Sequence, residues 1–307
     1  MKYQQNYTQW VFVWMVCNAK CSFCNAQIPL IWEKDYFSFY SFDRIKNDVQ
    51  AKVDKWANCI IYEWGDFSLH PEIFQILEFG KSLWIKQTLQ TNGIKLSDME
   101  FVKKLKESGV IEMNFSIHAH QEIVSDSIMW VKWFRKTIKW VLNCNKLWMN
   151  VSNNLVLVKE NLDQLEWMIF LLLKLNVKLF NITMYIPIDG TSIENFHEKF
   201  MVNPVDLWIE ISKMLKLYKK LMALSGKKLE LNLKFHNIWR CIFDKEHHDY
   251  DFQFDLDRRK QGGDKYKFDT GFYKKKDCKK CIYNNDCTGF TEKYIKIYWD
   301  SYIKPIY

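Results

Sequence analysis

The chain is poor in glycine and has no long apolar run. It contains 10 glycines and 14 tryptophans in 307 residues, although average usage of about 7% predicts roughly 20 glycines at this length. Its densest apolar stretch, Trp167 to Leu173, is far shorter than the roughly 20 residues that a bilayer span needs. The opening segment MKYQQNYTQW lacks the charged, apolar and small-residue regions of a secretory signal. We therefore expect a cytoplasmic chain without a membrane span.

The charge is basic but dispersed. Lysines and arginines give a formal net charge of +8 at pH 7, which could attract an acidic partner. The lysines are densest at Lys274, Lys275, Lys276, Lys279 and Lys280. No recognisable RNA- or DNA-binding motif accompanies them, so we interpret them as a solvated face and do not expect a nucleic-acid partner.

The nine cysteines are the most informative residues. Seven of them form two groups, at opposite ends of the chain: Cys17, Cys21 and Cys24, then Cys241, Cys278, Cys281 and Cys287. In a chain without an export signal, thiols remain reduced, and close clusters indicate metal ligands rather than disulfides. The remaining two, Cys59 and Cys144, have apolar neighbours and are interpreted as inert core residues.

Short apolar runs alternate with longer amphipathic stretches through most of the chain. Strands are predicted over residues 11–16, 59–63, 85–90, 111–117, 151–158, 180–186 and 229–235. Helices are predicted over 42–56, from Pro71 onward, from Ser97 to Lys106, and over 131–141, 162–175 and 204–224. Ser97 and Glu100 have the spacing of a capping box, and Gly109 would end that helix.

This alternation predicts an α/β fold with a parallel sheet and outer helices. About six units favour an incomplete (β/α)6-type barrel, with active residues at the carboxyl ends of its strands. Periodicity fades after the strand at 229–235, so we predict a barrel over residues 1–234 and a small irregular C-terminal cluster-binding domain over 235–307.

The first cysteine group has the spacing C-x3-C-x2-C and directly follows a predicted strand. Three thiolates within eight residues can hold three irons of one cubane cluster. The fourth iron then has no protein ligand, and an open metal position is where chemistry occurs, whereas a structural zinc site is closed. The alternative is zinc with a distant fourth ligand such as His70 or His118.

This spacing, with the aromatic Phe23 before the third cysteine, resembles the radical S-adenosylmethionine (SAM) superfamily. The resemblance continues at successive strand ends in Trp64-Gly65-Asp66, Thr91-Asn92-Gly93 and Ser116-Ile117-His118, and then in Asn154 and Ile186-Pro187. It implies cofactor contacts from Phe23, Gly65, Asp66, Thr91, Asn92, Ser116, Asn154 and Pro187.

The resemblance also implies a 4Fe-4S cluster whose open iron chelates SAM and whose electron cleaves a sulfur–carbon bond of that cofactor. Plainer interpretations remain open: Asp66 as a charge at a helix N-terminus, and Thr91 with Asn92 as a turn. His70, His118 and His120 are interpreted as ordinary polar residues at strand ends. No residue is predicted to act as the catalytic acid or base.

The second group, Cys278, Cys281 and Cys287, gains a plausible fourth ligand in Cys241. It resembles the C-terminal auxiliary-cluster regions of the SPASM and Twitch groups, and four cysteines suffice for one further 4Fe-4S cluster, as in the shorter Twitch arrangement. A closed tetrahedral zinc site is the alternative.

The scarcity of glycine suggests a further hypothesis. Trp64 stands where the family pattern has its first glycine, and Trp130, Trp133, Trp140 and Trp299 occupy turn- or packing-type positions. The hypothesis is that some of these tryptophans correspond to UGA codons, which the source organism reads as glycine. If residue 64 is tryptophan in the native protein, its indole would crowd the methionine end of SAM.

The resemblance implies an enzyme that abstracts hydrogen from a substrate, with a peptide or protein side chain as the leading expectation and a ferredoxin or flavodoxin as reductant. A small metabolite, as in the molybdenum-cofactor synthesis enzymes, is the alternative substrate. A non-catalytic iron–sulfur or zinc protein that binds nucleic acid is the alternative of another class.

Overall fold

The computed structural model describes residues 7–13, 16–24, 38–94, 98–187, 197–226, 229–253 and 272–307. The chain divides into two compact units. The first comprises residues 1–117, 125–153 and 175–178, and the second comprises 118–124, 154–174 and 179–307. Among the residues that the structure describes, no helix combines the length and the apolar character of a membrane span.

Eight strands follow one another in hydrogen-bonding order as they do in sequence. They are β1 (Thr8–Phe12), β2 (Cys59–Glu63), β3 (Lys86–Thr91), β4 (Val110–Phe115), β5 (Asn150–Leu157), β6 (Leu179–Met184), β7 (Asn232–His236) and β8 (Asp251–Gln253). The pairs β1–β2, β2–β3, β3–β4 and β4–β5 are parallel, as are β6–β7 and β7–β8. In parallel strands the carboxyl ends share one edge of the sheet, which is where β/α proteins place their sites.

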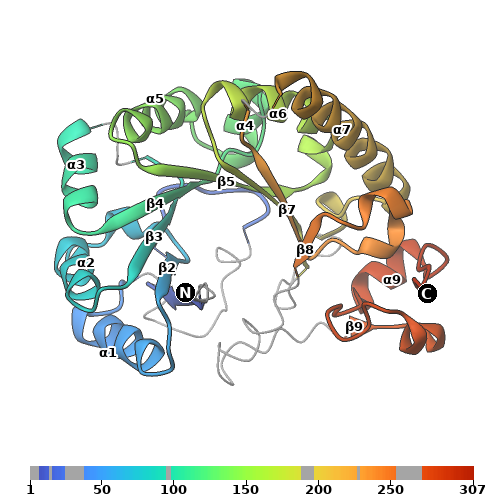
Figure 1. Cartoon of the computed structure of the whole chain (residues 1–307), viewed down its shortest axis with the longest axis horizontal. Helices are drawn as coiled ribbons and strands as arrows, with labels where there is room; N and C mark the ends of the chain where they lie inside the picture. Colours follow the sequence, from blue (N-terminus) through green and yellow to red (C-terminus); the bar gives the residue numbers. More distant parts are fainter. Residues whose placement is uncertain are drawn as a thin grey trace. The chain divides into compact units, whose positions relative to one another are not determined.

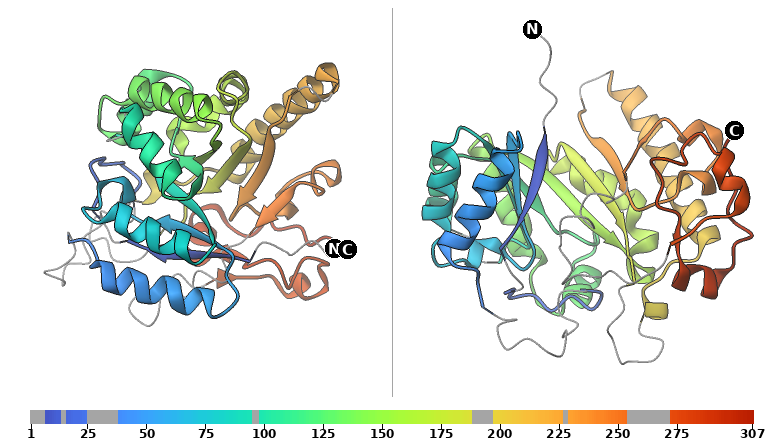
Figure 2. Two further views of the ribbon diagram at one scale, coloured as in Figure 1. Left: turned by 60° about the vertical axis from the view of Figure 1, so that its left-hand side comes forward. Right: turned by 90° about the horizontal axis from the view of Figure 1, so that it is seen from below.

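In the first unit, helices cover the face of β1 to β4 that is outer in Figure 1. They are α1 (Phe42–Val53), α2 (Ile73–Ser82) and α3 (Met99–Glu107), and α5 (Phe134–Lys146) follows β4; the further views show the same layering (Figure 2). Helix α1 begins where the Ser41 hydroxyl accepts a bond from the Arg44 N–H at 3.4 Å, and it buries Ile45 and Val49. Helix α4 (Glu122–Met129) lies between β4 and α5 in sequence.

In the second unit, α6 (Leu165–Lys174) and the long α7 (Pro204–Ser225) pack beside β6 and β7 (Figures 1 and 2). Asn203 caps α7 by accepting a bond from the Val205 N–H at 2.8 Å, with proline at the first helical turn. The C-terminal residues form an antiparallel pair, β9 (Phe272–Tyr273) with β10 (Phe290–Thr291), and helix α9 (Glu292–Tyr298).

The tail is fixed to the rest of the second unit by aromatic side chains. Trp239 stacks on Phe290 with ring centroids 3.9 Å apart, and its indole N–H donates to the Gly289 carbonyl at 2.8 Å. The Tyr294 and Tyr298 hydroxyls donate to main-chain carbonyls just before α7, at 2.7 and 2.8 Å. Because these donors are satisfied where they are buried, the tail packs as a defined element rather than a loose extension.

The predicted α/β fold is confirmed, and every predicted strand is present within a few residues of its expected bounds. The sheet has eight strands, which are the seven that the sequence predicts and β8, which adds an edge after the point where periodicity fades. The helix expected from Pro71 begins at Ile73. Helix α3 is capped by Asp98, whose carboxylate accepts from the Glu100 N–H at 2.9 Å; Ser97 lies outside the described residues.

Candidate functional site

The first three cysteines lie on a loop, residues 16–24, that follows β1 at the carboxyl edge of the first unit's strands. Main-chain bonds hold this loop in place. The Asp66 N–H donates to the Val16 carbonyl at 2.8 Å, and the Lys20 N–H donates to the Met129 carbonyl at 3.2 Å. The loop is therefore tied both to the turn after β2 and to the end of α4.

An apolar cluster packs against two of the thiols. Its buried members are Ala19, Met129 and Trp133, and Cys17 and Cys21 pack on it, each partly exposed. Burial, then the Asp66 charge and then Cys24, raises the pKa of Cys17 to about 12. Burial, then Cys24 and then Cys17, raises the pKa of Cys21. Cys24 raises the pKa of both Cys17 and Cys21, so the three thiols lie near one another and their thiolates require a cation for stability.

Asn92, the first residue after β3, links the cysteine loop to the sheet. Its side-chain N–H donates to the Cys17 Sγ atom at 3.4 Å and to the Asn18 Oδ1 atom at 2.9 Å. Its carbonyl accepts bonds from the Trp133 indole at 2.7 Å and from the Thr137 hydroxyl at 3.2 Å. Through these four hydrogen bonds, Asn92 fixes the position of the first thiol relative to β3 and α5.

Asp66 is fully buried, and its carboxylate is occupied by protein donors. It accepts bonds from the Ser68 N–H at 3.0 Å and hydroxyl at 2.6 Å, from the Thr91 hydroxyl at 2.9 and 3.0 Å, and from the Asn92 N–H at 3.1 Å. Burial raises the pKa of Asp66, and these bonds oppose that shift. This geometry gives Asp66 a positioning role that joins the turn after β2 to the end of β3; direct contact with SAM stays a prediction.

Asp66 also caps a short 3-10 helix over Phe67–Leu69, since its side chain accepts from the N–H of Ser68. The interpretation of Asp66 as a helix N-terminal charge thus describes part of what it does. Thr91 and Asn92 likewise form a turn, with the Gly93 N–H donating to the Thr91 hydroxyl at 2.9 Å. The turn and the link to the cysteine loop are compatible, because they use different atoms.

Three further predicted contact residues lie in the same unit. Phe23 is 7% exposed, Gly65 has a φ of 63° in the turn after β2, and Ser116 follows β4 with its N–H bonded to the Thr91 carbonyl at 3.2 Å. Together with the cysteines, they are brought to the ends of β1 to β4. Their contact with SAM stays a prediction.

The remaining two predicted contacts belong to the second unit. Asn154 lies within β5 and accepts a bond from the Thr183 hydroxyl at 2.8 Å. Pro187 is buried just after β6. Nothing in the geometry of the second unit assigns either of them a ligand, so both remain predictions.

The histidines named in the sequence have structural partners. His70 Nε2 is 2.8 Å from the Tyr40 carbonyl and its Nδ1 accepts from the Glu72 N–H at 3.0 Å. The His118 Nδ1 atom accepts from the Val156 N–H at 3.3 Å, and burial lowers the pKa of His118 to about 4. His120 stacks against Trp167 with centroids 5.6 Å apart. These contacts agree with ordinary polar roles.

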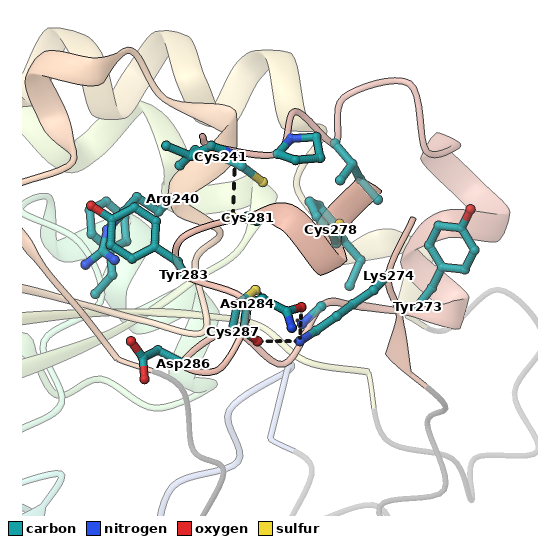
Figure 3. Close-up of a pocket in the computed structure, with 16 residues that line it drawn as sticks. Arg240, Cys241, Tyr273, Lys274, Cys278, Cys281, Tyr283, Asn284, Asp286 and Cys287 are labelled. Atoms are coloured by element: carbon teal, nitrogen blue, oxygen red, sulfur yellow. Dashed lines mark hydrogen bonds between the residues drawn. The ribbon is translucent and has the colours of Figure 1, made fainter. Parts of the chain in front are cut away.

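The second group of cysteines surrounds a single pocket in the second unit (Figure 3). Four thiols from three segments line it: Cys241, Cys278, Cys281 and Cys287. Burial above all, and then the neighbouring Cys287, Cys278 and Cys281, raise the pKa of Cys241 to about 12. Two main-chain N–H groups reach these sulfurs, from Gly289 to Cys287 at 3.3 Å and from Ile306 to Cys281 at 3.4 Å.

Several residues of the two sites were not predicted. Asn18 and Trp133 bind Asn92, and only the position of Asn18 beside Cys17 could have suggested it. Arg240 lies in the second pocket with its guanidinium 3.9 Å from the ring centroid of Tyr283. Lys274, in the same pocket, donates to the Asn284 carbonyl at 2.7 Å (Figure 3). The lysine-rich stretch was interpreted as a solvated face, yet this lysine lines a pocket.

The donor chemistry of both groups fits iron–sulfur clusters. In the described residues, no group of three or more Cys, His, Asp or Glu side chains is arranged as a metal ion would hold it. The first loop nevertheless brings three thiols together against apolar side chains, and the second pocket is lined by four. Thiols are the usual ligands of such clusters, and a dry surrounding limits solvent access.

The comparison with known families agrees with this geometry. The sequence matches the radical SAM superfamily over residues 11–172, which includes the cysteine loop and the ends of β2, β3 and β4. Because the match covers more than half of the chain, the protein belongs to the radical SAM superfamily, a class of enzymes that use a 4Fe-4S cluster and SAM. This membership overturns the alternative of a non-catalytic binding protein.

Individual relatives are distant. A "Probable GTP 3',8-cyclase" of Sulfolobus acidocaldarius is 24% identical over 147 residues, which are 47% of this chain and 45% of that protein. SuiB of Streptococcus suis, solved with SAM, shares the fold with a TM-score of 0.67 and 15% identity over 97% of this chain and 77% of SuiB. SuiB solved with its precursor peptide SuiA gives a TM-score of 0.64 at 15% identity, over 97% of this chain and 75% of SuiB.

Proposed function

We propose that this enzyme cleaves SAM at a 4Fe-4S cluster held by Cys17, Cys21 and Cys24 and abstracts hydrogen from a peptide or protein side chain. The observation that carries the proposal is the bond from the Asn92 amide to the Cys17 Sγ atom. It connects the cysteine loop to a strand end, where β/α enzymes build their sites. A structural metal loop would not require this link to the ends of β2 and β3.

The protein's own residues hold and shield the reacting groups. When bound, the cluster supplies the electron that breaks a sulfur–carbon bond of SAM, and the cofactor carries the difficult chemistry. Asp66 keeps Thr91 and Asn92 in place through its buried carboxylate. Met129 and Trp133 keep water from the thiols on one side. The Asn92 amide, which donates to the ligand sulfur of Cys17, also helps to set the cluster potential.

The second pocket is proposed to hold an auxiliary 4Fe-4S cluster through Cys241, Cys278, Cys281 and Cys287. Four thiols lining one pocket support a fully ligated centre. The guanidinium of Arg240 and the ammonium of Lys274 in the same pocket offset the negative charge of a thiolate-bound cluster. A tetrahedral zinc ion uses the same four ligands and is the competing occupant.

The choice of a peptide substrate rests on the fold of the whole chain. The SuiB structure with its bound precursor peptide covers 97% of this chain, including the C-terminal tail. A metabolite is the second candidate, because the relative from Sulfolobus acidocaldarius is a probable GTP 3',8-cyclase. That match covers less than half of either chain, so it supports the shared SAM chemistry more than a shared substrate. A ferredoxin or flavodoxin is the proposed reductant.

The experiment uses the anaerobically reconstituted full chain with SAM and a strong reductant. Peptides encoded beside the gene, deuterated in their side chains, and GTP deuterated on its ribose are supplied in separate reactions. The proposal expects deuterium in the 5′-deoxyadenosine from the peptide reaction alone. Deuterium transfer from GTP alone would show that the substrate is the metabolite and not a peptide. An absence of 5′-deoxyadenosine in both reactions would refute SAM cleavage.

A further inference from the structure

The ends of the helices reveal an unusual use of tryptophan. Each of the eight α-helices in the described part of the chain is followed within three residues by a residue with positive φ. Two of these residues are glycines, Gly109 and Gly226, and one is Asn176. The other five are tryptophans: Trp56, Trp84, Trp130, Trp148 and Trp299.

These tryptophans make the hydrogen bonds that a glycine makes at a helix end. The Trp56 N–H donates to the Val53 carbonyl at 2.8 Å, and the next N–H donates to the Lys52 carbonyl at 3.0 Å. The pairs after α4 and α5 repeat this pattern at Trp130 and Trp148. It is the Schellman motif, whose left-handed residue is usually glycine because a Cβ atom is strained there.

Trp299 is the most demanding case. Its φ of 63° and ψ of 171° lie in a region that is essentially restricted to glycine. Trp64 is a sixth example, with a φ of 71° directly before Gly65, whose φ is 63°. Outside these six tryptophans, the only positive-φ residues other than glycine in the described ranges are Asn176 and Asn237, and asparagine tolerates this conformation.

Packing does not compensate for the strain at the helix ends. The side chains of the five tryptophans are between 71% and 95% exposed, with Trp84 the most exposed. An exposed indole contributes almost no burial free energy. Neither the backbone conformation nor side-chain packing therefore favours tryptophan at these positions. The backbone at all six positions is the one that glycine adopts without strain.

We infer that Trp56, Trp64, Trp84, Trp130, Trp148 and Trp299 are glycines in the native protein, encoded by UGA codons that the source organism reads as glycine. The replacement also accounts for the composition, because six glycines added to the ten bring the chain toward average usage. At residue 64 it turns the segment before Asp66 into Gly-Gly-Asp. A backbone without side chains can approach a ligand closely, so residue 64 then permits the cofactor contact expected there; this last step rests on the proposed function.

The inference does not extend to every tryptophan that the sequence suggested. Trp133 has a φ of −141°, and its buried indole donates the 2.7 Å bond to the Asn92 carbonyl. Trp140 lies inside α5 and packs edge-on against Phe115 with centroids 5.5 Å apart. Neither backbone requires glycine, so the positive φ separates the six positions from these two.

Peptide mass spectrometry of the protein isolated from its source organism tests the inference directly. The expected result is glycine at all six positions and tryptophan at 133 and 239. The second position is an internal control, because Trp239 is buried and its indole is hydrogen-bonded. Tryptophan at the six positions would overturn the inference, whatever the enzyme's substrate proves to be.

Thermal unfolding of recombinant chains provides a second readout. Replacing the five exposed helix-end tryptophans by glycine together is expected to raise the unfolding midpoint by about 5 °C or more. The matched control is Trp167→Gly, which also removes an exposed tryptophan but lies inside α6, and it should lower the midpoint. A fall in the midpoint of the five-fold variant would contradict the strain argument.

Discussion

The side-chain amide of Asn92 donates a hydrogen bond to the Sγ atom of Cys17 across 3.4 Å, although the two residues are 75 positions apart. The same amide group holds the Asn18 side chain. This relationship makes the cysteine loop part of the sheet's carboxyl edge rather than a separate metal loop. In the proposed function, Asn92 acts on the cluster through the ligand Cys17.

Asn92→Ala removes the donor to the Cys17 sulfur without touching a ligand. Loss of a partner that orients a metal ligand typically costs about 10- to 100-fold in metal affinity or activity. We expect a drop of that size in 5′-deoxyadenosine formation and a visible shift in the reduction potential of the first cluster. Thr137→Val is the matched control, since it removes only the 3.2 Å bond to the Asn92 carbonyl; equal effects from both variants would argue for a merely structural role.

Asp66→Asn replaces one of the two carboxylate oxygens by an amide N–H₂, so either the Ser68 N–H, which donates to Oδ1, or the Asn92 N–H, which donates to Oδ2, loses its acceptor. Leaving such a buried donor unpaired costs about 1–3 kcal/mol in unfolding free energy. The measurement is denaturant unfolding of the cluster-free chain. Asp48→Asn changes a half-exposed carboxylate paired with Lys52 and should stay within about 0.5 kcal/mol. An unfolding free energy of Asp66→Asn equal to that of the parent chain would refute the positioning role.

His118 gives the folded chain a defined pH dependence. Burial lowers the pKa of His118 to about 4 from its ordinary 6.5, so the unfolded chain binds the proton more readily between these values. The neutral imidazole therefore contributes to the free energy of unfolding in full above pH 6.5, and this contribution is lost as the pH falls toward 4. The contribution is at most about 3 kcal/mol.

Denaturant unfolding of the cluster-free chain at pH 7 and pH 5 measures this contribution. In His118→Asn the amide oxygen can still accept the Val156 N–H bond, but nothing at this position titrates. The variant should therefore lose less stability between the two pH values than the parent chain. Equal losses would show that His118 is not buried as a neutral base.

The two cysteine groups should be separable by mutation. Cys278→Ser with Cys287→Ser removes two of the four thiols that line the second pocket. We expect roughly half of the cluster iron to be lost, with slow SAM cleavage in the absence of substrate retained. Iron analysis and product chromatography give the answer, with Cys59→Ala as the control thiol. If zinc rather than iron falls in this variant, the second site is the tetrahedral alternative.

Local patterns in the sequence predicted the strands well because buried parallel strands read as apolar runs. The strand at Cys59–Glu63 has the predicted bounds. Strand β8 was missed because its three residues, Asp251–Gln253, carry one buried apolar side chain and no visible periodicity. Short edge strands depend on the neighbouring strand for their definition more than on their own residues.

The candidate site divides in the same way. The cysteine spacing was visible in the sequence, since its eight residues carry the signal by themselves. The role of Asp66 was not visible in the sequence. Its partners Thr91 and Asn92 lie 25 and 26 residues away, and they contact Asp66 only when β2 and β3 pair. The scarcity of glycine was visible as composition, but the individual positions required the backbone angles of residues such as Trp84 and Trp148.

Cys17, Cys21 and Cys24 are proposed to hold the cluster at which SAM is cleaved. The most direct test of this proposal is the formation of 5′-deoxyadenosine from SAM by anaerobically reduced, reconstituted chain, compared with the triple variant Cys17→Ala, Cys21→Ala, Cys24→Ala. We expect 5′-deoxyadenosine from the parent chain and none above background from the triple variant. Equal amounts from both, or none from the fully reconstituted parent, would contradict it.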